Sequence, residues 1–172
     1  MEKERNDEWY TREYAVKPIL EFLKPNSKIW CPFDMDDSEF VKVLKKEGHT
    51  VINTHIWKSQ DFFEIVKTDL SNWNLDYIIS NPPYSKRKQV IEALIDLNTP
   101  FAMLLPLVSI VLKSFRLNLD VLEMLGFKKR IKYNAQNGML NKNAPSETGY
   151  ICMNMLPRAM MTKEIGDVND VY

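Results

Sequence analysis

Cysteine, glycine and histidine are all scarce in this sequence of 172 residues, which holds two cysteines, five glycines and two histidines. Cys31 and Cys152 lie far apart, and neither belongs to a Cys-x-x-Cys pair. This argues against a disulfide framework and for a reducing compartment. The two histidines form no cluster with other metal ligands, so we expect no metal site. The first glycine of the chain is Gly48.

Net charge is absent as well, because 23 basic residues balance 23 acidic ones. Any binding to nucleic acid must therefore come from a local basic patch. No apolar stretch approaches the roughly 20 residues that a membrane-spanning helix needs. The charged N-terminus (1–8) indicates no signal peptide. We expect a cytoplasmic protein that does not contact a membrane.

The apolar pattern predicts one α/β domain over residues 1–172. Expected strands cover 28–33, 50–56, 75–80, 101–107, 128–133 and 149–155, and expected helices cover 13–23, 38–47, 88–97 and 114–125. Strands that alternate with helices indicate a mostly parallel sheet with helices on both faces. The last two strands have no helix between them and favour an antiparallel hairpin at one edge of the sheet.

Polar and aromatic residues follow several of these strands, and ligands of open α/β sheets bind beyond the carboxyl ends of strands. The most informative group is Asn81-Pro82-Pro83-Tyr84, directly after the apolar strand 75–80. Two prolines end the strand and fix the backbone, so that the Asn81 oxygen and a neighbouring carbonyl can accept hydrogen bonds from one amine. An exposed Tyr84 would offer a flat stacking face. The alternative is a simple proline turn with a surface tyrosine.

This tetrapeptide resembles the catalytic motif of the N6-adenine DNA methyltransferases that use S-adenosylmethionine, and the resemblance extends over most of the chain. It implies a Rossmann-like class I methyltransferase fold and methyl transfer to the N6 amine of adenine in DNA. Asn81 and the Pro82 carbonyl would hold the amine, Pro83 would fix the turn, and Tyr84 would stack on the base. The base would be flipped out of a duplex or taken from a single strand.

The same resemblance implies a set of residues that bind S-adenosylmethionine. Three segments match the family's order, and Asn81 borders the cofactor as well. These cofactor residues are Trp9, Tyr10 and Thr11 near the N-terminus, Cys31, Pro32, Phe33 and Asp34 at the first strand, and Asp61 and Phe62.

The sequence departs from the family at the loop 33–38, where the family carries glycines that let the backbone approach the cofactor. Aspartates stand there instead, and two roles are open to Asp34, Asp36 and Asp37: contact with the cofactor, or capping of the helix that begins near Ser38. A second departure follows the second strand, where Thr54-His55 replaces the usual acidic residue.

Lys86, Arg87 and Lys88 follow the motif and are candidates for contact with nucleic-acid phosphates. No segment is long enough for a separate target-recognition domain. We therefore expect a short site, a single-stranded substrate or a partner subunit that supplies recognition. Other interpretations remain open: methylation of RNA adenine or of a protein glutamine amide, and a non-catalytic methyltransferase-like module that binds nucleic acid.

Overall fold

The computed structural model describes residues 11–68, 70–111, 120–134, 140–141 and 147–165. Its centre is a seven-stranded sheet in the order β2-β1-β3-β4-β8-β5-β9. The strands are β1 (Lys28–Cys31), β2 (Thr50–Asn53), β3 (Tyr77–Ser80), β4 (Phe101–Pro106), β5 (Glu123–Phe127), β8 (Thr148–Met153) and β9 (Met160–Lys163). A separate small sheet pairs β6 (Tyr133–Asn134) with β7 (Leu140–Asn141).

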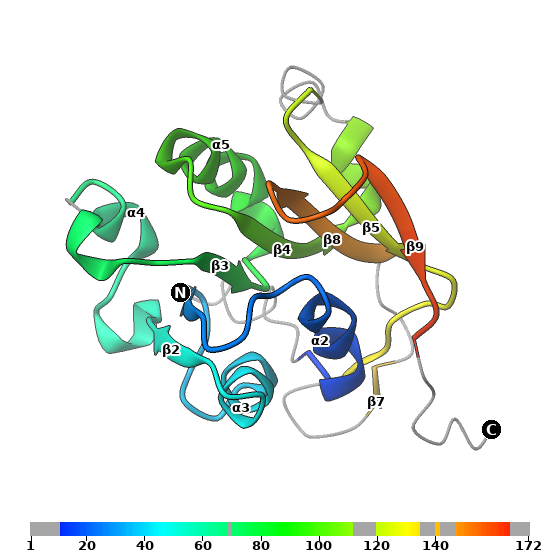
Figure 1. Ribbon diagram of the computed structural model, residues 1–172, viewed down its shortest axis with the longest axis horizontal. Helices are drawn as coiled ribbons and strands as arrows, with labels where there is room; N and C mark the ends of the chain where they lie inside the picture. Colours follow the sequence, from blue (N-terminus) through cyan, green and yellow to red (C-terminus); the bar gives the residue numbers. More distant parts are fainter. Residues whose placement is uncertain (1–10, 69, 112–119, 135–139, 142–146, 166–172) are drawn as a thin grey trace.

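Helical segments connect these strands and cover both faces of the sheet (Figure 1). The α-helices are α2 (Glu13–Leu20), α3 (Glu39–Lys46), α4 (Phe62–Ile65) and α5 (Arg87–Leu97). The short 3-10 turns are η1 (Ile56–Lys58), η2 (Ser71–Trp73), η3 (Tyr84–Lys86) and η4 (Leu107–Val111). Within the described residues, no helix is long and apolar enough to cross a membrane.

Two apolar layers lie on opposite faces of the sheet because neighbouring strand residues point to opposite sides. In β1, Ile29 and Cys31 pack on the face covered by α2 and α3. Trp30, which lies between them in the chain, packs on the other face with residues of α4 and α5. Figure 1 shows α2 and α3 on one side of the strands and α5 on the other.

The end signals of α3 are those that the sequence predicts. The Ser38 hydroxyl accepts a hydrogen bond from the Val41 N–H at 3.2 Å and caps the helix. The helix ends before Gly48, whose φ of +87° is a conformation that favours glycine. Phe40, Val41, Val43 and Leu44 supply the buried face. This short, highly charged helix is therefore fixed by its cap and its apolar stripe.

The direction of the strand order reverses between β1 and β3. The chain runs from β1 through α3 to β2 on one side of β1, and it then returns to place β3 on the other side. All three strands are parallel, so their carboxyl ends meet at one edge. Such a switch point is where open α/β sheets bind ligands.

The expected mostly parallel Rossmann-like sheet is confirmed, but the placement of the antiparallel pair is wrong. β8 does not lie at the edge. It inserts between β4 and β5 and is antiparallel to both, while β9 forms the edge and is parallel to β5.

Two element predictions near the C-terminus are also wrong. Glu123–Phe127 is strand β5 rather than the end of a helix, and most of 128–133 is not a strand. Residues 112–119 of the expected helix lie outside the described part of the chain. Leu-Glu-Met-Leu favours a helix locally, but pairing with β8 and β9 overrides that preference. The Glu123 carboxylate also accepts from the backbone N–H groups of Met155 and Leu156, at 3.0 and 2.8 Å.

Candidate functional site

The candidate site lies at the switch point, where Phe33 and Asp34 follow β1 and Asn81 follows β3. A single hydroxyl group joins these two segments. The Ser80 Oγ accepts a hydrogen bond from the Phe33 N–H at 3.3 Å and donates to the Asp34 Oδ2 at 2.5 Å. The ends of β1 and β3 are thus tied together directly before the Asn81 side chain.

Asp34 is a buried carboxyl group with a raised pKa. Its residue exposure is 6%, and burial raises the pKa to about 6, against the opposing effect of the hydroxyls of Ser80 and Ser38. Its backbone N–H donates to the Thr54 carbonyl at 3.2 Å, which adds a link to the end of β2. Asp34 therefore contacts the ends of all three parallel strands.

Side-chain hydrogen bonds hold the rest of the loop 33–38, which contains no glycine. Asp36 accepts from the Asn53 Nδ2 at 2.9 Å and from the Lys58 Nζ at 2.6 Å, and these two bonds lower the pKa of Asp36. The Asn53 Nδ2 also donates to the Asp34 carbonyl at 3.2 Å. The side chain that caps α3 is Ser38. Asp34 thus lies inside the site, whereas Asp36 is exposed on the side of β2.

Asn81 is held by a residue from the N-terminal segment. Its Nδ2 donates to the Thr11 Oγ1 at 3.1 Å, although 70 residues separate the two. This bond uses the NH2 group of the amide, so the acceptor Oδ1 points away from Thr11. The structure therefore brings together two of the predicted residues, Thr11 and Asn81. Trp9 and Tyr10 lie outside the described residues.

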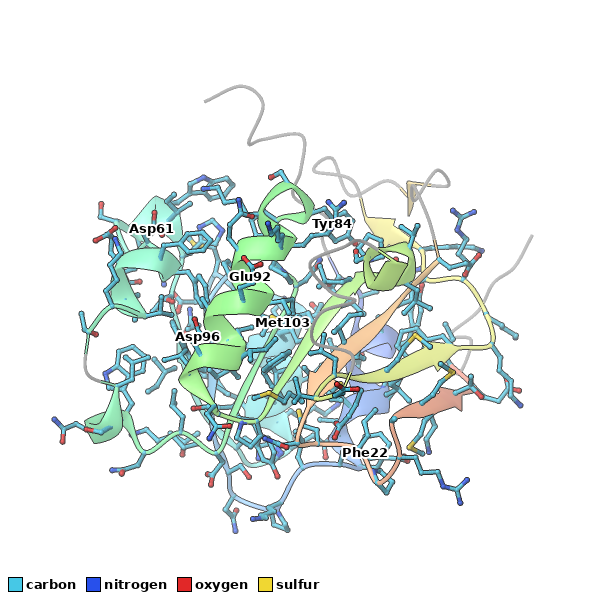
Figure 2. The ribbon with its side chains drawn as sticks, turned by 90° about the horizontal axis from the view of Figure 1, so that it is seen from above. Phe22, Asp61, Tyr84, Glu92, Asp96 and Met103 are labelled. Carbon is cyan, nitrogen blue, oxygen red and sulfur yellow. The ribbon has the colours of Figure 1, made fainter. Side chains whose placement is uncertain are left out.

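The expectation of an exposed Tyr84 is wrong, since only 7% of the residue is exposed. Tyr84 begins η3, which runs directly into α5, and it packs in the apolar layer with Val90, Ile91 and Phe62. It precedes Ile91 by seven residues, a spacing that places both on the buried face of one helical segment. Figure 2 shows Tyr84 at the beginning of α5, with Glu92 and Asp96 farther along the helix.

The basic run after the motif makes three separate contacts. The Lys86 Nζ lies 5.8 Å from the centre of the Phe63 ring, and the Arg87 guanidinium donates to the Tyr84 carbonyl at 2.5 Å. The Lys88 Nζ lies 3.9 Å from the Glu92 carboxylate, on the surface. The three cations therefore point to different partners, and contact with phosphates stays a prediction.

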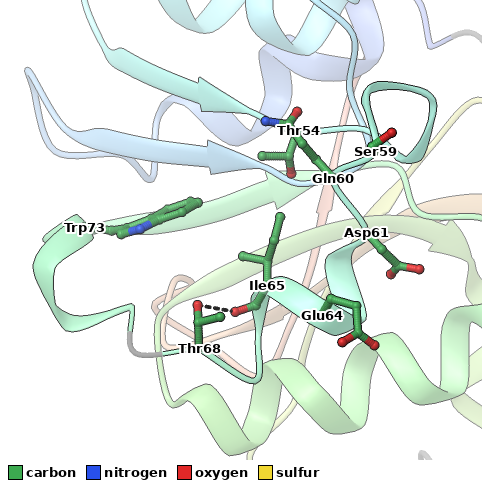
Figure 3. Close-up of a pocket in the computed structure, with 8 residues that line it drawn as sticks. All are labelled: Thr54, Ser59, Gln60, Asp61, Glu64, Ile65, Thr68 and Trp73. Atoms are coloured by element: carbon green, nitrogen blue, oxygen red, sulfur yellow. Dashed lines mark hydrogen bonds between the residues drawn. The ribbon is translucent and has the colours of Figure 1, made fainter.

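A pocket of about 350 Å³ lies beside α4 and the end of β2 (Figure 3). It is lined by Thr54, Ser59, Gln60, Asp61, Glu64, Ile65, Thr68 and Trp73. Asp61 lines the pocket and caps α4, where its Oδ1 accepts from the Phe63 N–H at 2.8 Å. Phe62, by contrast, is buried and stacks on Trp30 with ring centres 5.7 Å apart. Of this predicted pair, only Asp61 reaches the pocket.

Two further predicted cofactor residues, Cys31 and Pro32, directly precede Phe33 in the chain. Cys31 and Pro32 are buried, and the pKa of the Cys31 thiol is raised by burial and then by the nearby Asp34 charge. His49 and His55 accept hydrogen bonds from backbone N–H groups through Nδ1, so both have structural roles. Among the described residues, no three side chains form a group that could hold a metal ion.

Ser80 and Thr54 contact residues of the candidate site, and the sequence alone did not point to either of them as a site residue. Ser80 links Asp34 to Phe33, and the Thr54 Oγ1 accepts from the Trp30 Nε1 at 3.0 Å. The available signal for Ser80 is a lone hydroxyl in a strand that is otherwise apolar and buried, Tyr77–Ser80. A buried hydroxyl needs a partner, and the partner here is a carboxylate.

Comparison with known proteins finds no match in sequence and two solved structures of limited similarity. The sequence matches no family model and resembles no curated protein significantly. One similar structure is a release-factor-specific protein-(glutamine-N5) methyltransferase from Alicyclobacillus acidocaldarius, with 15% identity and a TM-score of 0.48 over 83% of this chain and 93% of that one. Another, from Listeria monocytogenes, is assigned to the class I S-adenosylmethionine-dependent methyltransferases. It has 11% identity and a TM-score of 0.47, and the match covers 92% of this chain and 65% of that one.

Proposed function

We propose that this protein is an S-adenosylmethionine-dependent methyltransferase that acts on a planar amine, with the N6 amine of adenine in DNA as its first candidate acceptor. The observation that carries the proposal is the position of Asn81-Pro82-Pro83-Tyr84. The motif begins at the carboxyl end of β3, at the switch point of the sheet and beside the Phe33–Asp34 segment. An acceptor motif and a donor-side loop that lie at the ends of neighbouring strands are what a group-transfer enzyme requires.

The donor side has room for a nucleoside in the pocket that Thr54 and Asp61 line. The Asp61 carboxylate can accept a hydrogen bond from a purine amine, and Trp73 and Ile65 supply apolar surface. The loop 33–38 would hold the rest of the cofactor with a backbone fixed by Asp34, Asp36 and Ser38 rather than by glycines. S-adenosylmethionine supplies an electrophilic methyl group on a sulfonium sulfur.

On the acceptor side, the Asn81 Oδ1 and the Pro82 carbonyl would accept hydrogen bonds from the target NH2 group. These bonds hold the nitrogen lone pair in line with the methyl carbon. Bound S-adenosylmethionine would supply an in-line displacement, in which the sulfur would keep the electron pair of the C–S bond, the nitrogen would gain the methyl group, and the proton of the nitrogen would pass to solvent. The bond from Asn81 to Thr11 keeps the amide from rotating during this displacement.

A second acceptor, a protein glutamine amide, is favoured by the burial of Tyr84. A base that lies in the site would stack on an exposed ring, but Tyr84 packs in the core. A glutamine side chain presents the same planar NH2 group and needs no stacking partner. RNA adenine presents the same amine and the same ring as DNA adenine, so an experiment must distinguish the acceptors.

Replacing Asn81 by alanine is expected to lower methyl transfer by on the order of 10²–10³-fold, because the variant loses one of the two groups that align the amine. The assay offers methyl-labelled S-adenosylmethionine with duplex DNA, single-stranded DNA, RNA and a protein extract. Gln89→Ala, an exposed position on α5, is the matched control and should keep the rate of the unmodified protein.

If the label appears in DNA adenine and is lost in Asn81→Ala, the first acceptor is supported. If the label appears in protein, the glutamine alternative is supported. Absence of transfer to every acceptor, together with no rise in melting temperature on addition of S-adenosylmethionine, overturns the enzyme proposal. That outcome leaves the non-catalytic binding module, whose DNA affinity can be measured directly.

A further inference from the structure

We infer that Asp34 is a positioning residue that acts through Ser80 on Asn81 and that it does so as a carboxylate. The inference builds on the proposed function, since it names a residue that controls the acceptor site without contacting the acceptor. Its structural basis is the chain of contacts from Asp34 to Ser80 and from there, along the backbone, to Asn81.

The direction of the Ser80 hydrogen bond follows from its two partners. A serine hydroxyl has one proton and two acceptor lone pairs. The Phe33 N–H donates to the Ser80 Oγ, so the hydroxyl proton is directed at the Asp34 Oδ2, 2.5 Å away. A bond to an ionised oxygen is short and strong. The ionised Asp34 therefore holds the last residue of β3, and with it the backbone from which the Asn81 side chain projects.

The surroundings of Asp34 do not compensate its charge. Its polar contacts are the hydroxyls of Ser80 and Ser38, and in the described residues no lysine or arginine is among the causes of its pKa shift. The titratable groups around it are Cys31 on β1, Asp36 and Asp37 in the same loop, and His55, which follows the Thr54 carbonyl that accepts from the Asp34 N–H. Lys45 of α3 acts on Cys31 and on Asp36, but it is not among the causes of the Asp34 shift. Asp36 is already paired with Lys58. A buried charge without a counter-ion opposes folding and is characteristic of functional sites.

The raised pKa gives opposite pH dependences for stability and for transfer. Because Asp34 has a pKa of about 6 in the folded protein against 3.8 ordinarily, the folded state binds the proton more tightly. Stability from this group is thus highest at low pH and falls as the pH rises from 3.8 to about 6. Transfer is faster with the carboxylate, so its rate should fall as the pH drops below about 6 and should level off ten- to a hundredfold lower, where Asp34 is protonated.

The test compares Asp34→Asn with Asp96→Asn, an exposed aspartate near the end of α5 and outside the candidate site. Asparagine cannot ionise, so Asp34→Asn should melt at a higher temperature at pH 8 and should transfer methyl groups ten- to a hundredfold more slowly, at about the same KM for the acceptor. The transfer rate of Asp34→Asn should no longer fall as the pH drops below about 6. Asp96→Asn should match the unmodified protein in all three measurements. A lower melting temperature of Asp34→Asn at pH 8 would show that the carboxylate only stabilises the fold.

A second measurement does not depend on activity. In 15N-labelled protein, the side-chain NH2 signal of Asn81 is assigned by its loss in Asn81→Ala and is followed from pH 4.5 to pH 8. We expect it to move with a midpoint near pH 6 in the unmodified protein and in Asp96→Asn, and to stay fixed in Asp34→Asn. A signal that does not move in the unmodified protein overturns the inference even if methyl transfer is observed. A signal that moves in a protein without transfer leaves the inference intact and rejects the proposed function.

Discussion

Substitution of Gly149 by alanine is expected to destabilise the fold by about 3 kcal/mol, because the added methyl group has no space. A Cβ at this position would lie 2.6 Å from the Leu125 carbonyl oxygen, 2.9 Å from the Leu107 Cδ2 and 3.3 Å from the Gly126 Cα. Two of these atoms belong to the backbone of β5, so the strand itself must move. Urea denaturation of the variant would measure the loss as a lower transition midpoint.

Gly126, on the neighbouring strand, provides the matched control. A Cβ added there would meet its nearest atoms at 3.7 to 3.8 Å, which is ordinary van der Waals contact. Gly126→Ala should therefore change the free energy of unfolding by less than about 1 kcal/mol. Equal midpoints for the two variants would contradict the close approach of β8 to β5.

Replacing Trp30 by alanine is expected to cost about 3–5 kcal/mol of stability. Trp30 is fully buried, and its ring lies 5.7 Å from that of Phe62 and 5.4 Å, edge to face, from that of Trp73. The substitution opens a cavity next to the pocket that Trp73 lines, and it leaves the buried Thr54 hydroxyl without its indole donor. Thermal and urea unfolding should both show the loss.

Trp57→Ala separates loss of packing from loss of a tryptophan as such. Trp57 is 55% exposed in η1, and removal of an exposed side chain usually changes stability by less than about 0.5 kcal/mol. If Trp57→Ala proves as destabilising as Trp30→Ala, the assignment of Trp30 to the core is incorrect. Tryptophan fluorescence of the two variants gives an independent comparison of burial.

The parts of the fold that the sequence predicts well are those whose signals are local. Ser38 and Gly48 define the ends of α3, and the apolar run before Asn81 becomes β3 with all four residues buried. The segment around Glu123 has a helical preference, and its pairing with β8 and β9 makes it a strand. That pairing depends on residues far away in the chain, which a local pattern does not contain.

The same contrast between local and long-range signals applies to the candidate site. Phe33 and Asp34 lie beside Ser80, the residue before Asn81, because the carboxyl ends of parallel strands share an edge. The bond between Thr11 and Asn81 spans 70 residues and has no sequence signal. The sequence signal at Tyr84 is misleading. A tyrosine after two prolines suggests a surface turn, but the helical segment that begins at this residue places the ring in the core.

The insertion of β8 between β4 and β5 also dictates an order of assembly. Neither β4 nor β5 can satisfy its facing backbone groups until a segment synthesised after both of them arrives. In the meantime β4 presents an open strand edge of six buried, mostly apolar residues, a template for wrong pairing. The final contacts are also remote in sequence, since the Tyr150 hydroxyl donates to the Ala15 carbonyl 135 residues earlier. Long-range closure of this kind slows folding, so a nascent chain that stops short of β8 is the form that would most need a chaperone.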